Sequence, residues 1–188
     1  MTQLEQYIKS YFGISEAHLN AISKMFKEER IEKNDFYLKK DQFCNKLSFI
    51  TEGNLRIFDI AANGKEITQW ISTPGDFITD LSGLIFRTKA RRDIKALSNT
   101  KLYTIYRTDY ELIGGEVPNW DKLEKLFIAK CFITLEDRIF SFLSMYSKER
   151  YEHLFAYKPS LFNEVPLQYL ASMLGMSPET LSRIRSNS

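Results

Sequence analysis

The chain has 188 residues, of which 44% are hydrophobic and 27% charged, with a formal net charge of +2. This composition is that of an ordinary globular protein with room for one or two cores, and it argues against intrinsic disorder. No apolar run reaches the roughly 18 residues of a membrane span, and the first residues lack the basic-then-apolar pattern of a signal peptide, so we expect a cytoplasmic protein without a membrane partner.

The segment from residue 1 to about residue 28 has the periodicity of amphipathic helices. Its apolar residues fall on two faces, Leu4, Ile8 and Phe12 on one and Leu19, Ile22, Met25 and Phe26 on the other. Ser15 stands where the second helix needs an N-cap. Two short helices are therefore expected at the start of the chain.

From Glu29 to Tyr106 the pattern changes to short alternating segments separated by turn residues. The expected strands are Phe36–Lys40, Lys46–Thr51, Asn54–Ile60, Glu66–Ser72, Asp93–Leu97 and Lys101–Tyr106. Asn63-Gly64 is the strongest hairpin signal, because both residues can adopt positive φ. Strands of this length and spacing predict an antiparallel roll of jelly-roll type.

Residues 110–146 read as a long helix that starts properly near Pro118 and carries two apolar stripes. The first repeats at spacings of 4, 3, 4, 3 and 4 and consists of Ile128, Phe132, Leu135, Ile139, Phe142 and Tyr146. The second consists of Trp120, Leu123, Phe127 and Cys131. The first stripe predicts knobs-into-holes packing with a partner helix, while the second would cover the roll. A helix fully buried within a monomer is the alternative.

The last 22 residues, from Leu167 to Ser188, have the pattern of a helix-turn-helix. Small Ala171 stands where two helices must cross closely, and Gly175 stands where the turn needs a left-handed backbone. Ser177 is a good N-cap, and Pro178 follows at the first helical position. The second helix would present Glu179, Ser182, Arg183 and Ser186 outward. These features together predict binding in the major groove of DNA.

This stretch resembles the C-terminal domain of the Crp/Fnr family of bacterial transcription regulators. The residues that carry the resemblance are Val165-Pro166, Ala171, Leu174-Gly175 and the string Glu179-Thr180-Leu181-Ser182-Arg183-Ile184. The strings Ser147–Tyr151 and Leu181–Arg185 look like the branch common in Bacteroidetes-type bacteria.

The resemblance implies roles for individual side chains. Glu179 and Arg183 would read base edges, Ser182 marks the Fnr-like variant, and Gln168 matches a phosphate contact. The expected DNA-binding residues are Gln168, Ser177, Pro178, Glu179, Thr180, Ser182 and Arg183.

Family members that bind cyclic nucleotides carry a phosphate cassette in the roll: Pro-Gly-Asp, then Gly-Glu-Leu, then an Arg about ten residues on. This chain has Pro74-Gly75-Asp76, but Thr79-Asp80-Leu81 replaces Gly-Glu-Leu and Ala90 stands at the Arg position. Cyclic AMP binding is therefore not expected.

The loop that follows the altered cassette carries four positive charges between Arg87 and Arg92. It reads as a solvated loop, with an anionic effector or an acidic protein surface as alternatives. The residues considered for an effector pocket are Thr79, Asp80, Arg87 and Arg91.

The residues of the chain give little support for catalysis or metal binding. The only histidines, His18 and His153, lie in the terminal regions, outside the predicted roll. Cys44 and Cys131 stand far apart, so buried free thiols are expected, and two thiolates cannot hold an iron–sulfur cluster. We expect no enzyme activity, metal or cofactor.

The elements combine into an α+β fold with three parts. Residues 1–116 would form a cyclic-nucleotide-binding-like β-roll with N-terminal helices, 117–146 a dimerisation helix, and 147–188 the helix-turn-helix. The predicted function is a homodimeric transcription regulator that binds a palindromic operator in double-stranded DNA. The expected dimer interface is Ile128, Phe132, Leu135, Ile139 and Phe142.

RNA polymerase and an unknown small-molecule effector are considered as further partners. The alternative function is a ligand-binding or protein-interaction roll whose terminal helices do not bind DNA. It is favoured by the end of the chain three residues after Arg185, which leaves a short recognition helix and no β-wing.

Overall fold

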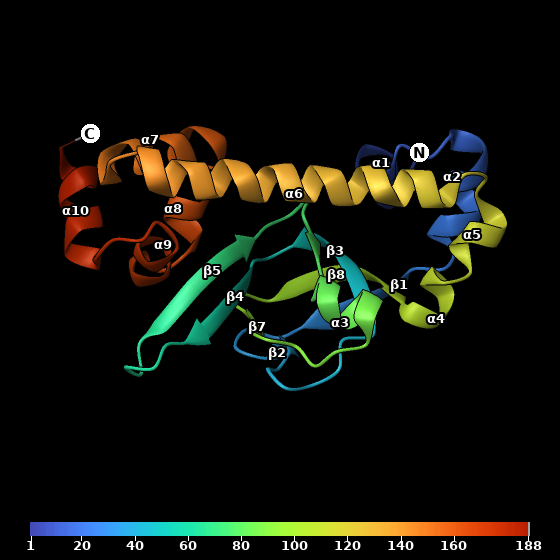
Figure 1. Ribbon diagram of the computed structural model, residues 1–188, viewed down its shortest axis with the longest axis horizontal. Helices are drawn as coiled ribbons and strands as arrows, with labels where there is room; N and C mark the ends of the chain where they lie inside the picture. The colour runs from blue at the N-terminus through green and yellow to red at the C-terminus, as the bar shows by residue number, and fades with distance from the viewer. Residues whose placement is uncertain (188) are drawn as a thin grey trace.

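One long helix, α6 (Trp120–Ser144), runs along the length of the molecule. The N-terminal helices lie at one of its ends and the C-terminal helices at the other, with the β-roll below its middle (Figure 1). The computed structural model describes residues 1–187. Ser188, the last residue of the predicted 147–188 domain, lies outside the described residues.

The N-terminal segment forms helices α1 (Gln3–Phe12) and α2 (Glu16–Ser23). Thr2 and Glu5 form a reciprocal capping box at the start of α1, which ends at Gly13 in the left-handed conformation. The two predicted apolar faces are buried or partly buried against the roll and α6. The helical pattern ends at Ser23, earlier than expected, and Lys27 already belongs to a strand.

The roll consists of eight strands in two antiparallel sheets. They are β1 (Lys27–Ile31), β2 (Phe36–Leu38), β3 (Lys46–Glu52), β4 (Leu55–Ile60), β5 (Glu66–Ser72), β6 (Phe77–Ile78), β7 (Asp93–Ala96) and β8 (Thr100–Tyr106). The sheet orders are β1-β8-β3-β6 and β2-β7-β4-β5. The predicted fold class is confirmed. The sequence pattern missed β1, which is mostly charged and largely solvent-accessible, and β6, which has two residues.

The hairpin between β4 and β5 has a different turn from the one expected. Only Gly64 has a positive φ, of 80°, and Asn63 does not. The Gly64 N–H donates to the Ala61 carbonyl, and the Ala61 N–H donates to the Lys65 carbonyl. The chain therefore makes a longer turn, from Ala61 to Lys65, in which one left-handed residue is sufficient.

Short helices connect the roll to the rest of the chain. They are α3 (Leu81–Phe86), α4 (Arg107–Tyr110) and α5 (Ile113–Glu116). The expected single helix from Tyr110 is thus interrupted, and α6 begins at Trp120, beyond Gly114-Gly115 and Pro118, which disfavour a continuous helix. The inner stripe of α6 is covered as predicted, because Trp120 and Phe127 are buried.

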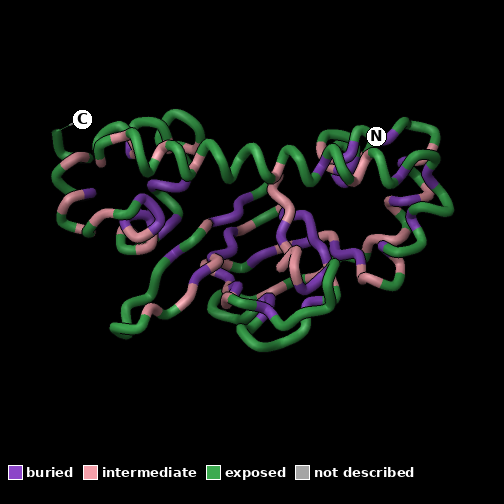
Figure 2. Tube along the Cα trace, viewed as in Figure 1, coloured by how far each residue is buried: buried purple, intermediate pink, exposed green. Residues whose placement is uncertain are grey.

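The C-terminal region contains α7 (Ser147–Tyr157), α8 (Leu161–Glu164), α9 (Leu167–Met173) and α10 (Pro178–Ser186). Its hydrophobic core also includes Ile71 of β5, so the C-terminal helices pack on the roll as well as on one another. Figure 2 shows the buried segments in the roll and at both ends of the molecule, while the middle of α6 is exposed.

Candidate functional site

Helices α9 and α10 are joined by the turn that the sequence predicts. Gly175 has φ +67°, the left-handed conformation expected there. The Ser177 hydroxyl accepts from the Thr180 N–H at 3.2 Å and caps α10, whose first residue is Pro178. Ala171 and Leu181 are fully buried between the helices. The segment therefore has helix-turn-helix geometry.

The outer face of α10 is open to solvent. Glu179, Ser182, Arg183 and Ser186 are all exposed, as is Gln168 at the start of α9. Ser177 is also exposed, while Pro178 and Thr180 are half-buried. The pKa of the Glu179 carboxyl lies below its ordinary value, chiefly because of a hydrogen bond from its own backbone N–H, with smaller contributions from Ser177 and Arg183. The Glu179 carboxyl is thus ionised at neutral pH, and the side chains of Glu179 and Arg183 both face solvent.

Two arginines that the sequence reasoning missed hold the helix-turn-helix in place. Arg138 of α6 donates to the Met173 carbonyl at 2.8 Å. Arg150 of α7 donates to the Leu174 carbonyl at 2.9 Å and to the Met145 carbonyl at 2.7 Å. These carbonyls lie at the C-terminal ends of α9 and α6, where helices leave acceptors unsatisfied. Arg150 lies in the Ser147–Tyr151 string, but the sequence does not indicate which carbonyls it reaches.

The helix-turn-helix is also tied to the roll. The Thr68 N–H of β5 donates to the Ser172 hydroxyl of α9 at 2.9 Å. The buried guanidinium of Arg56 lies 3.9 Å from the ring centre of Tyr169. The Asn54 side-chain amide donates to the Glu164 carboxylate at 2.9 Å. The position of α10 therefore depends on contacts with β4, β5 and the loop before β4.

The outer stripe of α6 is uncovered in the single chain. Its exposed fractions are Ile128 37%, Phe132 60%, Leu135 49%, Ile139 61% and Phe142 40%. Tyr146, predicted as the last member of this stripe, is 82% exposed but lies beyond the end of α6 at Ser144, because the chain is extended at Met145. Further apolar side chains beside it are exposed as well, namely Leu126, Ile133, Phe140 and Leu143. Exposed apolar side chains in this number on one helix are typical of a surface that associates with another molecule. The alternative prediction, a helix fully buried within one chain, is therefore wrong.

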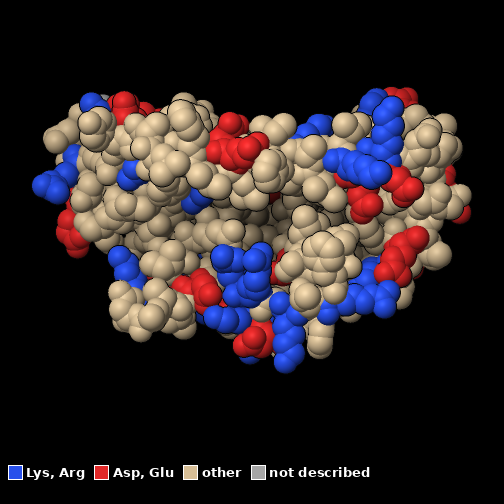
Figure 3. Space-filling model, viewed as in Figure 1, with Lys and Arg blue, Asp and Glu red and all other residues tan. Residues whose placement is uncertain are grey.

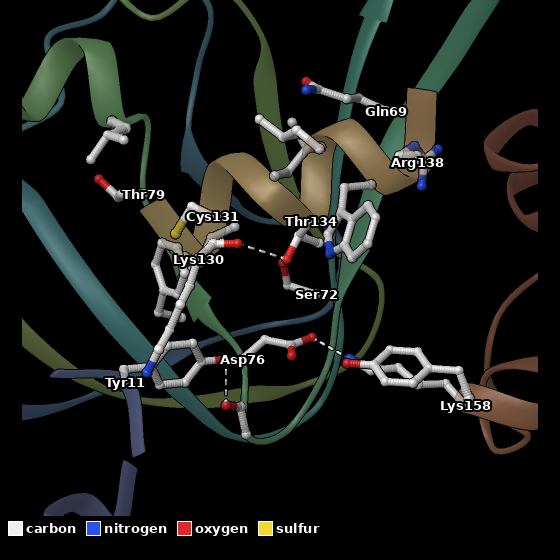
Figure 4. Close-up of a pocket in the computed structure, with 18 of the residues that line it drawn as sticks. Tyr11, Gln69, Ser72, Asp76, Thr79, Lys130, Cys131, Thr134, Arg138 and Lys158 are labelled. Atoms are coloured by element: carbon white, nitrogen blue, oxygen red, sulfur yellow. Dashed lines mark hydrogen bonds and ion pairs between the residues drawn. The ribbon is translucent and has the colours of Figure 1, made fainter. Parts of the chain in front are cut away.

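A cavity of about 1100 Å³ lies between α6 and the roll. Figure 3 shows the surface hollowed below α6. Residues of β5, β6, α6 and the end of α7 line it, and Figure 4 shows Lys130, Cys131, Thr134 and Arg138 on the α6 side. Lys158, at the end of α7, pairs with the Asp76 carboxylate at 2.5 Å and donates to the Thr73 hydroxyl at 2.7 Å.

The four residues considered for an effector pocket are not gathered in this cavity. Thr79 lines it and donates to the Lys46 carbonyl at 2.9 Å, whereas Asp80, Arg87 and Arg91 are not among the lining residues. Arg87 pairs instead with Glu111 at 3.3 Å.

At the start of α3, residues of the altered cassette form hydrogen bonds with the helix itself. The Asp80 carboxylate accepts from the Gly83 N–H at 2.6 Å and from the Ser82 hydroxyl at 2.8 Å, so this helix end is already capped by an anion. Ala90, which replaces the cassette arginine, is buried, and Arg91 beside it is exposed. The arginine position of the cassette is therefore filled by a buried alanine, the Asp80 carboxylate is used to cap α3, and Arg91 is exposed to solvent.

Both cysteines are free: Cys44 is buried and Cys131 is half-buried, with burial raising the pKa of the Cys131 thiol. Among residues 1–187, no three His, Cys, Asp or Glu side chains are grouped so that they could hold a metal ion. No helix in the same range is long and apolar enough to cross a membrane.

Comparison with known proteins identifies the roll. Residues 28–113 match the family model of the cyclic nucleotide-binding domain. The search of curated proteins found no match.

Solved structures share the fold over most of the chain. FixK2 from Bradyrhizobium japonicum is 17% identical, with a TM-score of 0.70 over 86% of this chain and 83% of that one. A CooA mutant from Carboxydothermus hydrogenoformans is 18% identical, with a TM-score of 0.64 over 89% and 78%. The Catabolite Activator Protein of Thermus thermophilus is 19% identical, with a TM-score of 0.59 over 93% and 84%.

The roll, the long helix and the terminal helix-turn-helix thus define a protein with a cyclic nucleotide-binding domain fold joined to a second, helical part. Its structural neighbours lie in the Crp/Fnr family of regulators.

Proposed function

We propose that this protein is a homodimeric, sequence-specific DNA-binding transcription regulator of Crp/Fnr type. The observation that carries the proposal is the outer face of α10, where Glu179 and Arg183 are exposed one helical turn apart on a well-capped helix. No carboxylate of the described residues lies within 4 Å of the Arg183 guanidinium. An exposed Arg without such a partner is free to contact a base edge.

In the proposed complex, Arg183 donates two hydrogen bonds to the O6 and N7 of a guanine, and Glu179 accepts from a cytosine amino group. Gln168, exposed at the start of α9, contacts a phosphate and carries no base information. Ser177, Pro178, Thr180 and Ser182 shape the end of α10 that enters the groove. The net charge of +2 is small for a DNA-binding protein, so base contacts and two-fold repetition carry more of the affinity.

The proposed dimer is built on the outer stripe of α6. Pairing two copies of Ile128, Phe132, Leu135, Ile139 and Phe142 in parallel would cover the exposed apolar face. It would also bring both α10 helices to the same side, where they would lie about 34 Å apart in successive major grooves. The expected operator is therefore palindromic, and the protein would act in the cytoplasm, with RNA polymerase as a further partner.

The test is selection of binding sites from random duplex DNA, followed by affinity measurement at two salt concentrations. Arg183→Ala should weaken binding to the preferred site by about 1–3 kcal/mol and relax its sequence preference. The matched control is Gln168→Ala, which should weaken binding to all sequences about equally. The same preferred site for wild type and Arg183→Ala would show that another residue reads the bases. Absence of binding to any duplex would favour the alternative, a roll whose terminal helices do not bind DNA.

The resemblance to the Bacteroidetes-type branch, carried by Ser147–Tyr151 and Leu181–Arg185, stays a prediction.

A further inference from the structure

The tip of the β4–β5 hairpin lies beside the helix that we propose to read DNA. Figure 1 shows this hairpin reaching the end of the molecule that carries α10. The pKa of the Glu179 carboxyl, lowered mainly by its own backbone N–H, is lowered further by the charge of Lys65 at the hairpin tip. An ammonium has this effect on a carboxyl only when the two groups are close. Lys65 is therefore near the first turn of α10.

The base of the hairpin is fixed to the helix-turn-helix. The Ser172 hydroxyl of α9 accepts from the Thr68 N–H at 2.9 Å and donates to the Glu66 carbonyl at 3.5 Å. The buried Arg56 of β4 donates to the Thr68 hydroxyl at 2.9 Å, and its guanidinium lies 3.9 Å from the ring centre of Tyr169 in α9. These contacts hold the hairpin in one position relative to α9 and so to α10.

The tip itself combines small residues with one unpaired cation. Its sequence from residue 61 to 65 is Ala-Ala-Asn-Gly-Lys, and residues 62–65 are all exposed. The carboxylate of the next residue, Glu66, is neutralised by Arg56 at 2.5 Å. Among the described residues, no carboxylate oxygen lies within 4 Å of the Lys65 ammonium. The Asn63 Oδ1 accepts from the Lys65 N–H at 3.1 Å, which leaves the Asn63 NH₂ group as a further donor.

The surroundings of a helix bound to DNA determine what such a tip would meet. The major groove is about 12 Å wide and is bordered on each side by a sugar–phosphate backbone. A side chain next to the inserted helix therefore faces phosphates, while the helix itself faces base edges. A lysine ammonium is a compact point charge that suits a phosphate oxygen.

We propose that the tip of the β4–β5 hairpin is a second DNA contact of this protein. In it, the Lys65 ammonium, assisted by the Asn63 amide, binds a backbone phosphate beside the groove that α10 occupies. This inference rests on the proposed function and adds to it a contact supplied by the roll. An acidic protein surface is the other partner that a free lysine attracts, but the position of Lys65 beside Glu179 favours DNA.

The salt dependence of binding to the selected operator measures this contact. Each phosphate contact contributes about −0.9 to the slope of log K against log salt concentration. Lys65→Gln removes one contact from each protomer, so the slope should become less steep by about 1.8. At about 0.15 M salt the same relation predicts binding that is about 30-fold weaker. Preferred and random duplexes should lose affinity by the same factor, because a phosphate carries no base information.

Two further variants control for the change in charge. Lys24→Gln makes the same change at an exposed residue that ends α2, at the opposite end of the molecule (Figure 1), and should keep the wild-type slope. Ala62→Lys adds a cation at an exposed position of the hairpin tip and should make the slope steeper and the binding tighter. Ethylation interference should show the loss of one phosphate contact per half-site in Lys65→Gln.

The possible failures are distinguishable. If the wild type binds its operator and Lys65→Gln keeps the wild-type slope, the hairpin contact is overturned while the proposed function stands, and an acidic protein becomes the better partner for the tip. A loss of affinity restricted to the preferred sequence would show that Lys65 only orients Glu179, and would also overturn the contact. A wild type that binds no duplex would refute the proposed function and this inference together.

Discussion

Replacing Gly175 by Ala should destabilise the helix-turn-helix through two separable effects. The first is the backbone, because φ at this position is +67° and a left-handed residue with a Cβ costs about 1–2 kcal/mol. The second is steric, because the new Cβ would lie 2.6 Å from Cε1 of Phe142. Relieving an overlap in a packed region typically costs about 1–3 kcal/mol.

Phe142 has limited freedom to move away from the new methyl group. Its ring centre lies 5.3 Å from the guanidinium of Arg138 and 5.1 Å from that of Arg150, although 40% of the side chain is exposed. Because this exposure lets the ring shift partly into solvent, we expect the steric part to fall in the lower half of its range. The total loss for Gly175→Ala is then about 2–4 kcal/mol in the free energy of unfolding.

Gly13 provides a matched control for the backbone effect. Its φ is +68°, and a Cβ there would meet no atom within 4 Å. Gly13→Ala should thus cost about 1–2 kcal/mol, which is the backbone part alone. In a Phe142→Ala background the steric part should be absent. The difference in unfolding free energy between the double variant Gly175→Ala/Phe142→Ala and the single variant Phe142→Ala should therefore match the cost of Gly13→Ala.

Urea unfolding followed by far-UV circular dichroism, at one protein concentration throughout, measures these differences. If Gly175→Ala costs no more than Gly13→Ala, the close approach of α6 to the turn is refuted. A cost that persists in the Phe142→Ala background would place the obstruction elsewhere. Gly175→Ala should also weaken binding to the selected operator, alongside its loss of unfolding free energy, because α10 is positioned by this turn.

Three further predictions concern the dimer, the cassette and the roll. Ile139→Glu should yield monomers in sedimentation and abolish operator binding at the same time; a wild-type chain that is monomeric at tens of micromolar would contradict the proposed interface. Calorimetric titration with cyclic AMP or cyclic GMP should show no heat at sub-millimolar concentrations, and a dissociation constant of about one micromolar that Arg91→Ala abolishes would restore a nucleotide sensor. Burial raises the pKa of Glu29, but hydrogen bonds from Tyr106 and Lys46 outweigh it and hold the pKa below its ordinary 4.5. A carboxyl whose pKa is lowered by folding stabilises the fold at pH values above its pKa in the unfolded chain. This stabilisation is lost as the pH falls through the pKa of the folded protein. Glu29→Gln should therefore reduce stability most near neutral pH, with the difference shrinking below about pH 4.5; a difference that grows on acidification would invert this reasoning.

Local chemistry was enough to predict several parts of this protein. Gly175, Ser177 and Pro178 each have a conformational preference that acts within a few residues, and the structure has the turn, cap and helix start that these preferences require. Period-2 alternation located six of the eight strands, while the charged β1 and the two-residue β6 lacked that signal. The outer stripe of α6 was likewise visible in its spacing, and its exposure agrees with that pattern.

Tertiary structure alone decided what the long side chains and the distant segments do. Arg138 reaches the carbonyl of Met173, and the N–H of Thr68 finds the hydroxyl of Ser172 although 104 positions separate them. The cavity arises only because α6 lies across the roll, so that residues of α6 and residues of β5 and β6 line it together. A sequence encodes local torsional and burial preferences directly, whereas these contacts depend on how separate elements pack. A flexible side chain has many partners within reach until that packing selects one.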